Sequence, residues 1–146
     1  MKAALLTLAV LVETASAQHV SVAAEVTSVA TVGRWQGKGV TGSYRVVVVR
    51  DGWEHVWSRV YVEWLQDPID REAPPQGPVS VQELVPPDIA QGMAVLEATA
   101  KARKAGSVEI TVRATSNIDA GAKSRTFVYE ASQPGITTLI RGARAP

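Results

Sequence analysis

The sequence predicts an all-β domain that folds as a sandwich of two antiparallel sheets. Seven or eight short segments show the period-two alternation of apolar and polar residues that half-buried strands require. Gly, Pro, Asp and Asn residues, which favour turns, separate these segments. No segment has the 3.6-residue period of a convincing amphipathic helix. A partly closed β-barrel is the alternative architecture.

The N-terminal residues have the pattern of a secretory signal peptide, which we place at residues 1–17. Lys2 supplies the positive charge, Ala3 to Val12 form a short apolar run, and Ala15-Ser16-Ala17 resembles a cleavage site. The run is too short to cross a bilayer, so we expect no transmembrane segment after cleavage. The mature chain, residues 18–146, is then a single domain in the periplasm or outside the cell.

Composition narrows the class of partner. Lys and Arg number 15 and Asp and Glu number 14, and no basic stripe is present, so a nucleic-acid partner is not expected. The chain contains no Cys and therefore no disulfide, in spite of the predicted export. This cysteine usage fits a bacterial envelope protein better than a eukaryotic secreted module.

The first two predicted strands differ in how clearly the pattern defines them. Gln18 to Val32 alternates valines with small or polar residues and is predicted to form the first strand. Glycines interrupt residues 33–39, which we expect to be rich in turns or to hold only a short strand.

The stretch from Val40 to Leu65 is predicted to be one long β-hairpin. Asp51-Gly52 suits a two-residue type I′ turn, because both central positions require positive φ. That turn would place Val46 opposite Trp57. One face would then carry a cluster of aromatic and charged side chains, namely Tyr44, Arg50, Trp53, His55, Trp57, Arg59 and Tyr61. The other face, which we expect to be the core face, would carry Val47, Val49, Val56, Val60, Val62 and Trp64.

Turn-forming residues and the alternation of apolar and polar residues also define the remaining segments. The prolines indicate a long loop over 66–78, a short edge strand over Val79–Val85 and a turn over Pro86–Gly92. A second hairpin pairs 94–103 with 107–116 around a three-residue loop that ends at Gly106, because this register places apolar residues together and sets Lys101 opposite Glu109. Two more strands, around Phe127 to Tyr129 and over 136–140, complete the set, and 141–146 are expected to be frayed.

A sandwich of this size resembles the immunoglobulin architecture, which is the commonest arrangement of two such sheets. The Cys-Trp-Cys pattern of immunoglobulin domains is absent from the sequence. We therefore predict the immunoglobulin-like architecture and no particular family.

Catalytic and metal-binding patterns are weak. Two histidines, His19 and His55, do not form a ligand cluster, and no Ser lies in the sequence context of a nucleophile. Cleavage after Gln18 would leave His19 as an N-terminal copper ligand, a less favoured alternative. Acidic residues in the 66–78 loop are expected to be solvated rather than bound to calcium. We predict no enzyme activity, no metal and no cofactor.

The aromatic face of the hairpin is the candidate binding site. Tyr and Trp on a strand can anchor a protein or stack on a sugar, and Arg beside them adds hydrogen-bonding capacity. The same aromatic side chains could instead fill the core. We expect a non-catalytic binding or assembly module of the bacterial cell envelope, with an envelope protein or exported subunit bound at this face or at a sheet edge. A small carbohydrate-binding domain is the alternative, and a copper-binding or hydrolytic enzyme is less favoured.

Overall fold

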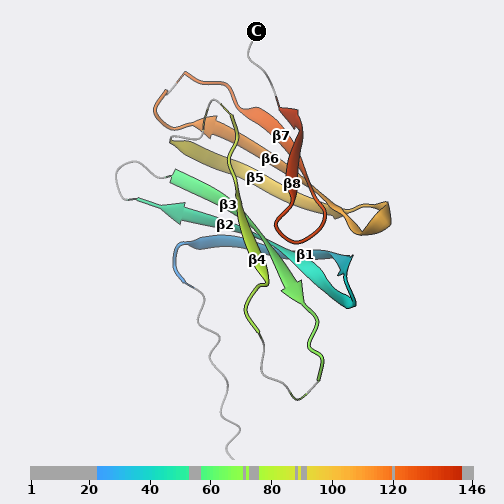
Figure 1. Ribbon diagram of the computed structural model, residues 1–146. Helices are drawn as coiled ribbons and strands as arrows, with labels where there is room; N and C mark the ends of the chain where they lie inside the picture. The colour runs from blue at the N-terminus through green and yellow to red at the C-terminus, as the bar shows by residue number, and fades with distance from the viewer. Residues whose placement is uncertain are drawn as a thin grey trace, which may run out of the picture.

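The computed structural model describes residues 23–52, 57–70, 72, 76–87, 89, 92–119 and 121–142. The predicted signal peptide lies outside these residues. Within these residues, eight strands form two four-stranded antiparallel sheets that do not close into a barrel, which confirms the predicted all-β sandwich (Figure 1). In chain order the elements are β1 (Val26–Gly37), β2 (Val40–Asp51), β3 (Trp57–Gln66), β4 (Ser80–Leu84), β5 (Met93–Ala102), the 3-10 turn η1 (Lys104–Gly106), β6 (Val108–Ser116), β7 (Arg125–Ala131) and β8 (Thr137–Gly142).

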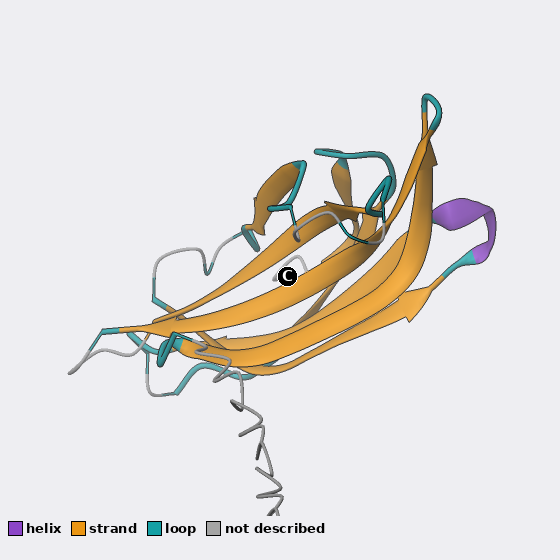
Figure 2. Cartoon of the chain, turned by 90° about the horizontal axis from the view of Figure 1, so that it is seen from below, coloured by secondary structure: helices purple, strands orange, loops and turns teal. Residues whose placement is uncertain are grey.

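Each sheet is a simple meander. The strand order is β1-β2-β3-β4 in the first sheet and β5-β6-β7-β8 in the second. Immunoglobulin domains exchange strands between their sheets through Greek-key connections. The two-layer architecture is therefore as predicted, but the connectivity is not that of an immunoglobulin domain. Figure 2 shows the strands as long curved ribbons, with the purple turn η1 projecting beyond them.

β1 extends further toward the C-terminus than the sequence pattern predicted. It continues to Gly37, through the passage that we expected to be rich in turns. A register shift between Val32 and Trp35 absorbs the irregularity, and Gly33 within it has a φ of +60°. A Cβ atom at Gly33 would lie 2.7 Å from Val108 Cγ2 in the second sheet. Gly33 therefore lets the bulge form against the opposite sheet.

The predicted register of the first hairpin is wrong. Asp51 pairs with Trp57, so the connection spans residues 52–56 rather than two residues. This changes the register by an odd number of residues, which exchanges the two faces of β2 relative to β3. The inward pairs become Tyr44 with Trp64, Val46 with Val62 and Val48 with Val60. The predicted core residues of β3 are buried as expected, whereas Val47 and Val49 lie on the outer face.

The core fills the space between the two sheets. From the first sheet, Tyr44 and Trp64 reach across, with ring centroids 6.0 Å apart. The Tyr44 hydroxyl lies 2.7 Å from the carbonyl oxygen of Gly106 and also contacts that of Ser132, to which the Trp64 indole donates at 3.3 Å. These bonds attach two aromatic side chains to backbone carbonyls in the connections at one end of the second sheet. From the second sheet the core receives Met93, Val108, Ile110, Val112, Ala114, Phe127, Tyr129 and Ala131.

The second hairpin has the predicted loop. Ala102 pairs with Val108, Ala100 with Ile110 and Lys101 with Glu109 around Lys104–Gly106, and Gly106 has a φ of +77°. One detail differs, because a bulge between Val95 and Glu97 makes Val95 the partner of Ala114 in place of Leu96. Leu96, expected on the apolar face, is consequently 50% exposed.

The remaining strands are close to their predicted positions. β4 is a five-residue edge strand that pairs with β3 alone within the described residues, as expected for a segment flanked by prolines. β8 extends to Gly142, so Arg141 belongs to a strand rather than to a frayed end. The chain between β4 and β5 crosses from one sheet to the other, and this crossover lies beside the site described next.

Candidate binding site

The structure divides the predicted aromatic face into two parts. Trp57, Arg59 and Tyr61 alternate along β3 and share the outer face of the first sheet. Tyr44 does not join them, because the corrected register turns it inward, where its side chain is fully buried. Tyr44 is therefore a core residue and its assignment to the binding face is wrong. Trp53 and His55 lie outside the described residues.

Arg50 is also separated from this group. It is exposed near the end of β2 and pairs with Ser58. Because side chains alternate along a strand, Arg50 shares the face of Tyr44 and not that of Arg59. Of the predicted set, the structure thus brings together Trp57, Arg59 and Tyr61.

A cavity of about 540 Å³ opens next to Trp57 and Arg59. It lies where β3 begins and β4 ends, against the first residues of β5 and the residues that follow β6. Its volume is within the range of small-ligand pockets. Most of its wall is apolar, and the residues other than Trp57 and Arg59 are Ser58, Glu83, Leu84, Val85, Pro86, Gly92, Met93, Asn117 and Ile118.

The inner wall of the cavity is buried, whereas its rim is exposed to solvent. Leu84 and Met93 are buried and belong to the core, so they form its inner wall. Trp57 is 48% exposed and Ile118 is 75% exposed at the rim. Large apolar side chains held open to solvent beside an apolar hollow are characteristic of a binding surface.

Charged groups border one side of the cavity. Arg59 Nε lies 4.0 Å from Glu83 Oε1, and Arg59 Nη1 donates to the Tyr61 hydroxyl at 3.5 Å. The bond to Tyr61, together with the nearby negative charge of Glu83, raises the pKa of Arg59 above its ordinary value. Arg59 thus remains a cation and Glu83 offers an acceptor, so a ligand can be oriented at the rim.

The outer face of the first sheet continues this apolar surface. Val47 pairs with Tyr61 and Val49 with Arg59, while Val81 and Val85 are exposed on or beside β4. The corresponding face of the second sheet is polar, with Glu97, Thr99, Lys101, Glu109, Thr111 and Arg113 in its register. Antiparallel sheets usually present polar residues to water. The first sheet follows this pattern only in part, because Val47, Val49 and Val81 share its outer face with the ion pair of Arg45 and Glu63.

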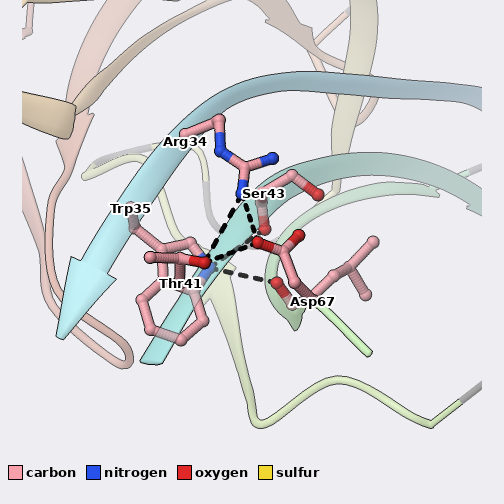
Figure 3. Close-up of polar contacts among 6 residues, drawn as sticks. Arg34, Trp35, Thr41, Ser43 and Asp67 are labelled. Carbon is pink, nitrogen blue, oxygen red and sulfur yellow. Dashed lines mark hydrogen bonds and ion pairs between the residues drawn. The ribbon is translucent and has the colours of Figure 1, made fainter. Parts of the chain in front are cut away.

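The opposite end of β3 holds a polar cluster with a structural role. Figure 3 shows Arg34 paired with Asp67, while the Thr41 hydroxyl donates to Asp67 at 2.6 Å. The Trp35 indole lies beside them and contacts the carbonyl oxygens of Ser43 and Leu65, each at 3.2 Å. The Thr41 hydrogen bond, with Arg34, lowers the pKa of Asp67. The cluster ties β1, β2 and the end of β3 together.

In the part of the chain that the structure describes, no three His, Asp or Glu residues are grouped so that they could hold a metal ion. In the loop over 66–78, the Asp67 carboxylate interacts with Thr41 and Arg34. Asp70 accepts a hydrogen bond from the Glu72 amide at 3.1 Å. Among the same residues, no helix has the length and apolarity needed to cross a bilayer.

Sequence reasoning found the rim of the cavity and missed its wall. Trp57 and Arg59 stood out as an aromatic and a cation on one strand. Leu84, Met93 and Ile118 come from segments that lie far apart in the sequence, and Ile118 lies in the connection that follows the second hairpin. An isolated isoleucine in this connection was the available indication of a second apolar contact.

Comparisons with protein-family models, curated proteins and solved structures found no match. The residues of the cavity are therefore the basis on which we propose a function.

Proposed function

We propose that this domain is a non-catalytic binding module that takes an apolar side chain of a protein partner into the cavity beside Trp57. The observation that carries the proposal is the position of Trp57, half-exposed at the mouth of an apolar hollow whose inner wall is Leu84 and Met93. Aromatic residues at the edge of a desolvated pocket are frequent anchors of protein interfaces.

The chemistry of the site supports a partner segment with one apolar anchor. The anchor would contact Leu84, Met93 and Ile118, where burial of its apolar surface contributes about 25 cal/mol per Å². Arg59 and Glu83 would bond the backbone of the segment at the rim. The valines of the outer face would extend the contact along β3 and β4.

The setting proposed for this module is the bacterial cell envelope. The charged and apolar segments of residues 1–17 support export, and the lack of cysteine fits a periplasmic or secreted protein. An envelope protein or an exported subunit is the kind of partner that such a setting provides.

Synthetic peptides test the proposal. Fluorescently labelled peptides with a single Leu, Phe or Trp in a Gly/Ser background are titrated against the domain, beside matched peptides with Ser at that position. We expect anchored peptides to bind and the Ser peptides not to bind. Trp57→Ala should weaken binding by at least about tenfold, the size of a typical interface anchor. Leu96→Ala, which truncates an equally exposed side chain on the second sheet, should leave binding unchanged.

Two results would count against this function. One is equal affinity for the anchored and Ser peptides. The other is an equal loss of affinity in Trp57→Ala and Leu96→Ala.

A carbohydrate-binding role is the second candidate. It is favoured by the presence of Arg59 and Glu83 beside Trp57. An exposed indole can stack on a sugar ring while charged groups bond its hydroxyls. Titration with a panel of oligosaccharides, followed by tryptophan fluorescence, separates the two roles. A glycan that binds in a Trp57-dependent manner, with no binding of the anchored peptides, would assign the site to carbohydrate.

A further inference from the structure

The edge strand β1 carries an inference that is independent of the cavity. In the described part of the chain β1 pairs with β2 and has no strand on its other side. An unpaired edge presents N–H and C=O groups that can bond another strand. Residues 26–32 of β1 read VTSVATV, without a charged residue or a proline. Charged residues and proline, two of the features that natural proteins use to block an edge, are thus absent over these seven residues, which do contain a bulge between Val26 and Ser28.

The other edges of the described sheets are better protected. β4 has five residues and includes Glu83. β5 contains Glu97 and Lys101, together with a bulge after Val95. β8 is six residues long and includes Arg141. β1 therefore offers the longest uncharged edge among them.

The part of β1 from Ser28 to Thr31 is also exposed on both of its faces. Val29 and Thr31 lie on the outer face, and Val29 is 51% exposed. Ser28 and Ala30 pair with Val48 and Val46, whose side chains point into the core. Ser28 and Ala30 are nevertheless exposed, which shows that the second sheet does not cover this part of β1. A strand added at this edge would meet no overlying layer there.

The sequence of β1 indicates which strand pairs with this edge. When VTSVATV is paired antiparallel with itself about Val29, Val26 faces Val32, Thr27 faces Thr31 and Ser28 faces Ala30. Thr27 and Thr31 are identical, Ser28 and Ala30 are both small, and most of the seven residues are β-branched residues that favour strands. The bulge between Val26 and Ser28 puts Val26 on the outer face, opposite Val49, whereas Val32 lies opposite the inward Tyr44, so the regular pairing is confined to the residues nearest Val29.

We propose that β1 pairs with β1 of a second copy of this chain about a twofold axis at Val29. The result is a continuous eight-stranded sheet formed from the first sheets of two molecules. Such a twofold contact is self-complementary, because the same residues serve both copies. Its area is small, so the dimer forms at micromolar concentration or above rather than as an obligate complex.

Charge substitution at the axis tests the proposal by sedimentation. The full chain should show a concentration-dependent twofold rise in mass. Val29→Lys and Val29→Glu each place like charges opposite one another, and each should raise the dissociation constant by at least about tenfold. An equimolar mixture of the two variants should recover dimers, and added salt should weaken the recovery. Leu96→Lys, at a comparably exposed site on the β5 edge, is the control and should dimerise like the unaltered chain.

A cysteine variant gives a second, covalent measurement. The chain has no cysteine, so Val29→Cys introduces a single thiol. Directly opposed residues of an antiparallel pair have Cβ atoms close enough for a disulfide bond. Under mild oxidation with oxidised glutathione, Val29→Cys should form a disulfide-linked dimer much faster than Leu96→Cys.

The proposal is overturned if the unaltered chain remains monomeric at concentrations on the order of 1 mM. It is also overturned if Val29→Lys dimerises as the unaltered chain does, or if Val29→Cys and Leu96→Cys crosslink at the same rate. Circular dichroism and thermal melting of each variant establish that it is folded. A folded Val29→Lys monomer together with a dimeric Leu96→Lys supports pairing through β1.

Discussion

Two buried tyrosines illustrate how the same side chain serves the fold in different ways. The Tyr44 hydroxyl contacts the carbonyl oxygens of Gly106 and Ser132 across the core. The Tyr129 hydroxyl is buried without a hydrogen-bond partner in the described structure. A buried hydroxyl that is bonded stabilises a protein, whereas one that is not bonded carries a desolvation cost. The two residues should therefore respond in opposite ways to loss of the hydroxyl.

We expect Tyr44→Phe to lower the free energy of unfolding by about 1 to 2 kcal/mol, because it removes a bond between the sheets. Tyr129→Phe should be neutral or should raise the free energy of unfolding by up to about 1 kcal/mol. Urea denaturation of the two variants at neutral pH measures the difference. A larger loss in Tyr129→Phe than in Tyr44→Phe would contradict this account of the core.

At the scale of the element, the two hairpins show what the sequence could and could not predict. The register of the second hairpin was predicted correctly from Glu97 to the loop, because an alternative loop length would have set Lys101 against Ile110. The first hairpin was mispredicted, because Asp51-Gly52 was taken as a complete turn. The ion pair between Arg45 and Glu63 held the missing information. These two charges lie opposite each other in the observed register and did not in the predicted one.

The loop of the second hairpin contains a residue in a left-handed backbone conformation. Ala105 has a φ of +68°, a conformation that costs a residue with a Cβ roughly 1 kcal/mol. Ala105→Gly should therefore raise the free energy of unfolding by about 0.5 to 1 kcal/mol. Ala102→Gly, in the adjacent strand, is the matched control and should lower it. Thermal melting that ranked Ala102→Gly above Ala105→Gly would contradict the loop geometry.

For the whole molecule, the sequence predicted the two layers and part of the candidate site. It did not predict how segments that are far apart in the sequence meet. Alternation and turn residues are local, so they defined most strands and the sandwich. The cavity combines residues near positions 57, 84, 93 and 118, and its wall depends on the way in which the two meanders are stacked. The same stacking buries Tyr44 and Tyr129, which gives the whole fold a dependence on alkaline pH.

Burial raises the pKa of both Tyr44 and Tyr129 to about 12. In the unfolded chain a tyrosine titrates near pH 10, so above that pH the unfolded state loses protons that the folded state retains. Stability should be complete below about pH 10 and should fall by up to about 1.4 kcal/mol per pH unit for each tyrosine up to about pH 12. Urea midpoints measured across this range should decline, and the decline should be shallower in Tyr129→Phe. Parallel curves for the two proteins would argue against burial of Tyr129.

The proposed function requires that a ligand enter the cavity between β3, β4 and β5, and Met93 provides a direct reporter. The sequence has two methionines, Met1 and Met93, and Met93 lies in the inner wall of the cavity. In protein labelled with ¹³C at the methionine methyl groups, Met93→Leu identifies the Met93 signal. We predict that an anchored peptide shifts this signal saturably, with the same dissociation constant as the fluorescence titration. A peptide that binds while the Met93 signal stays unmoved would contradict the claim.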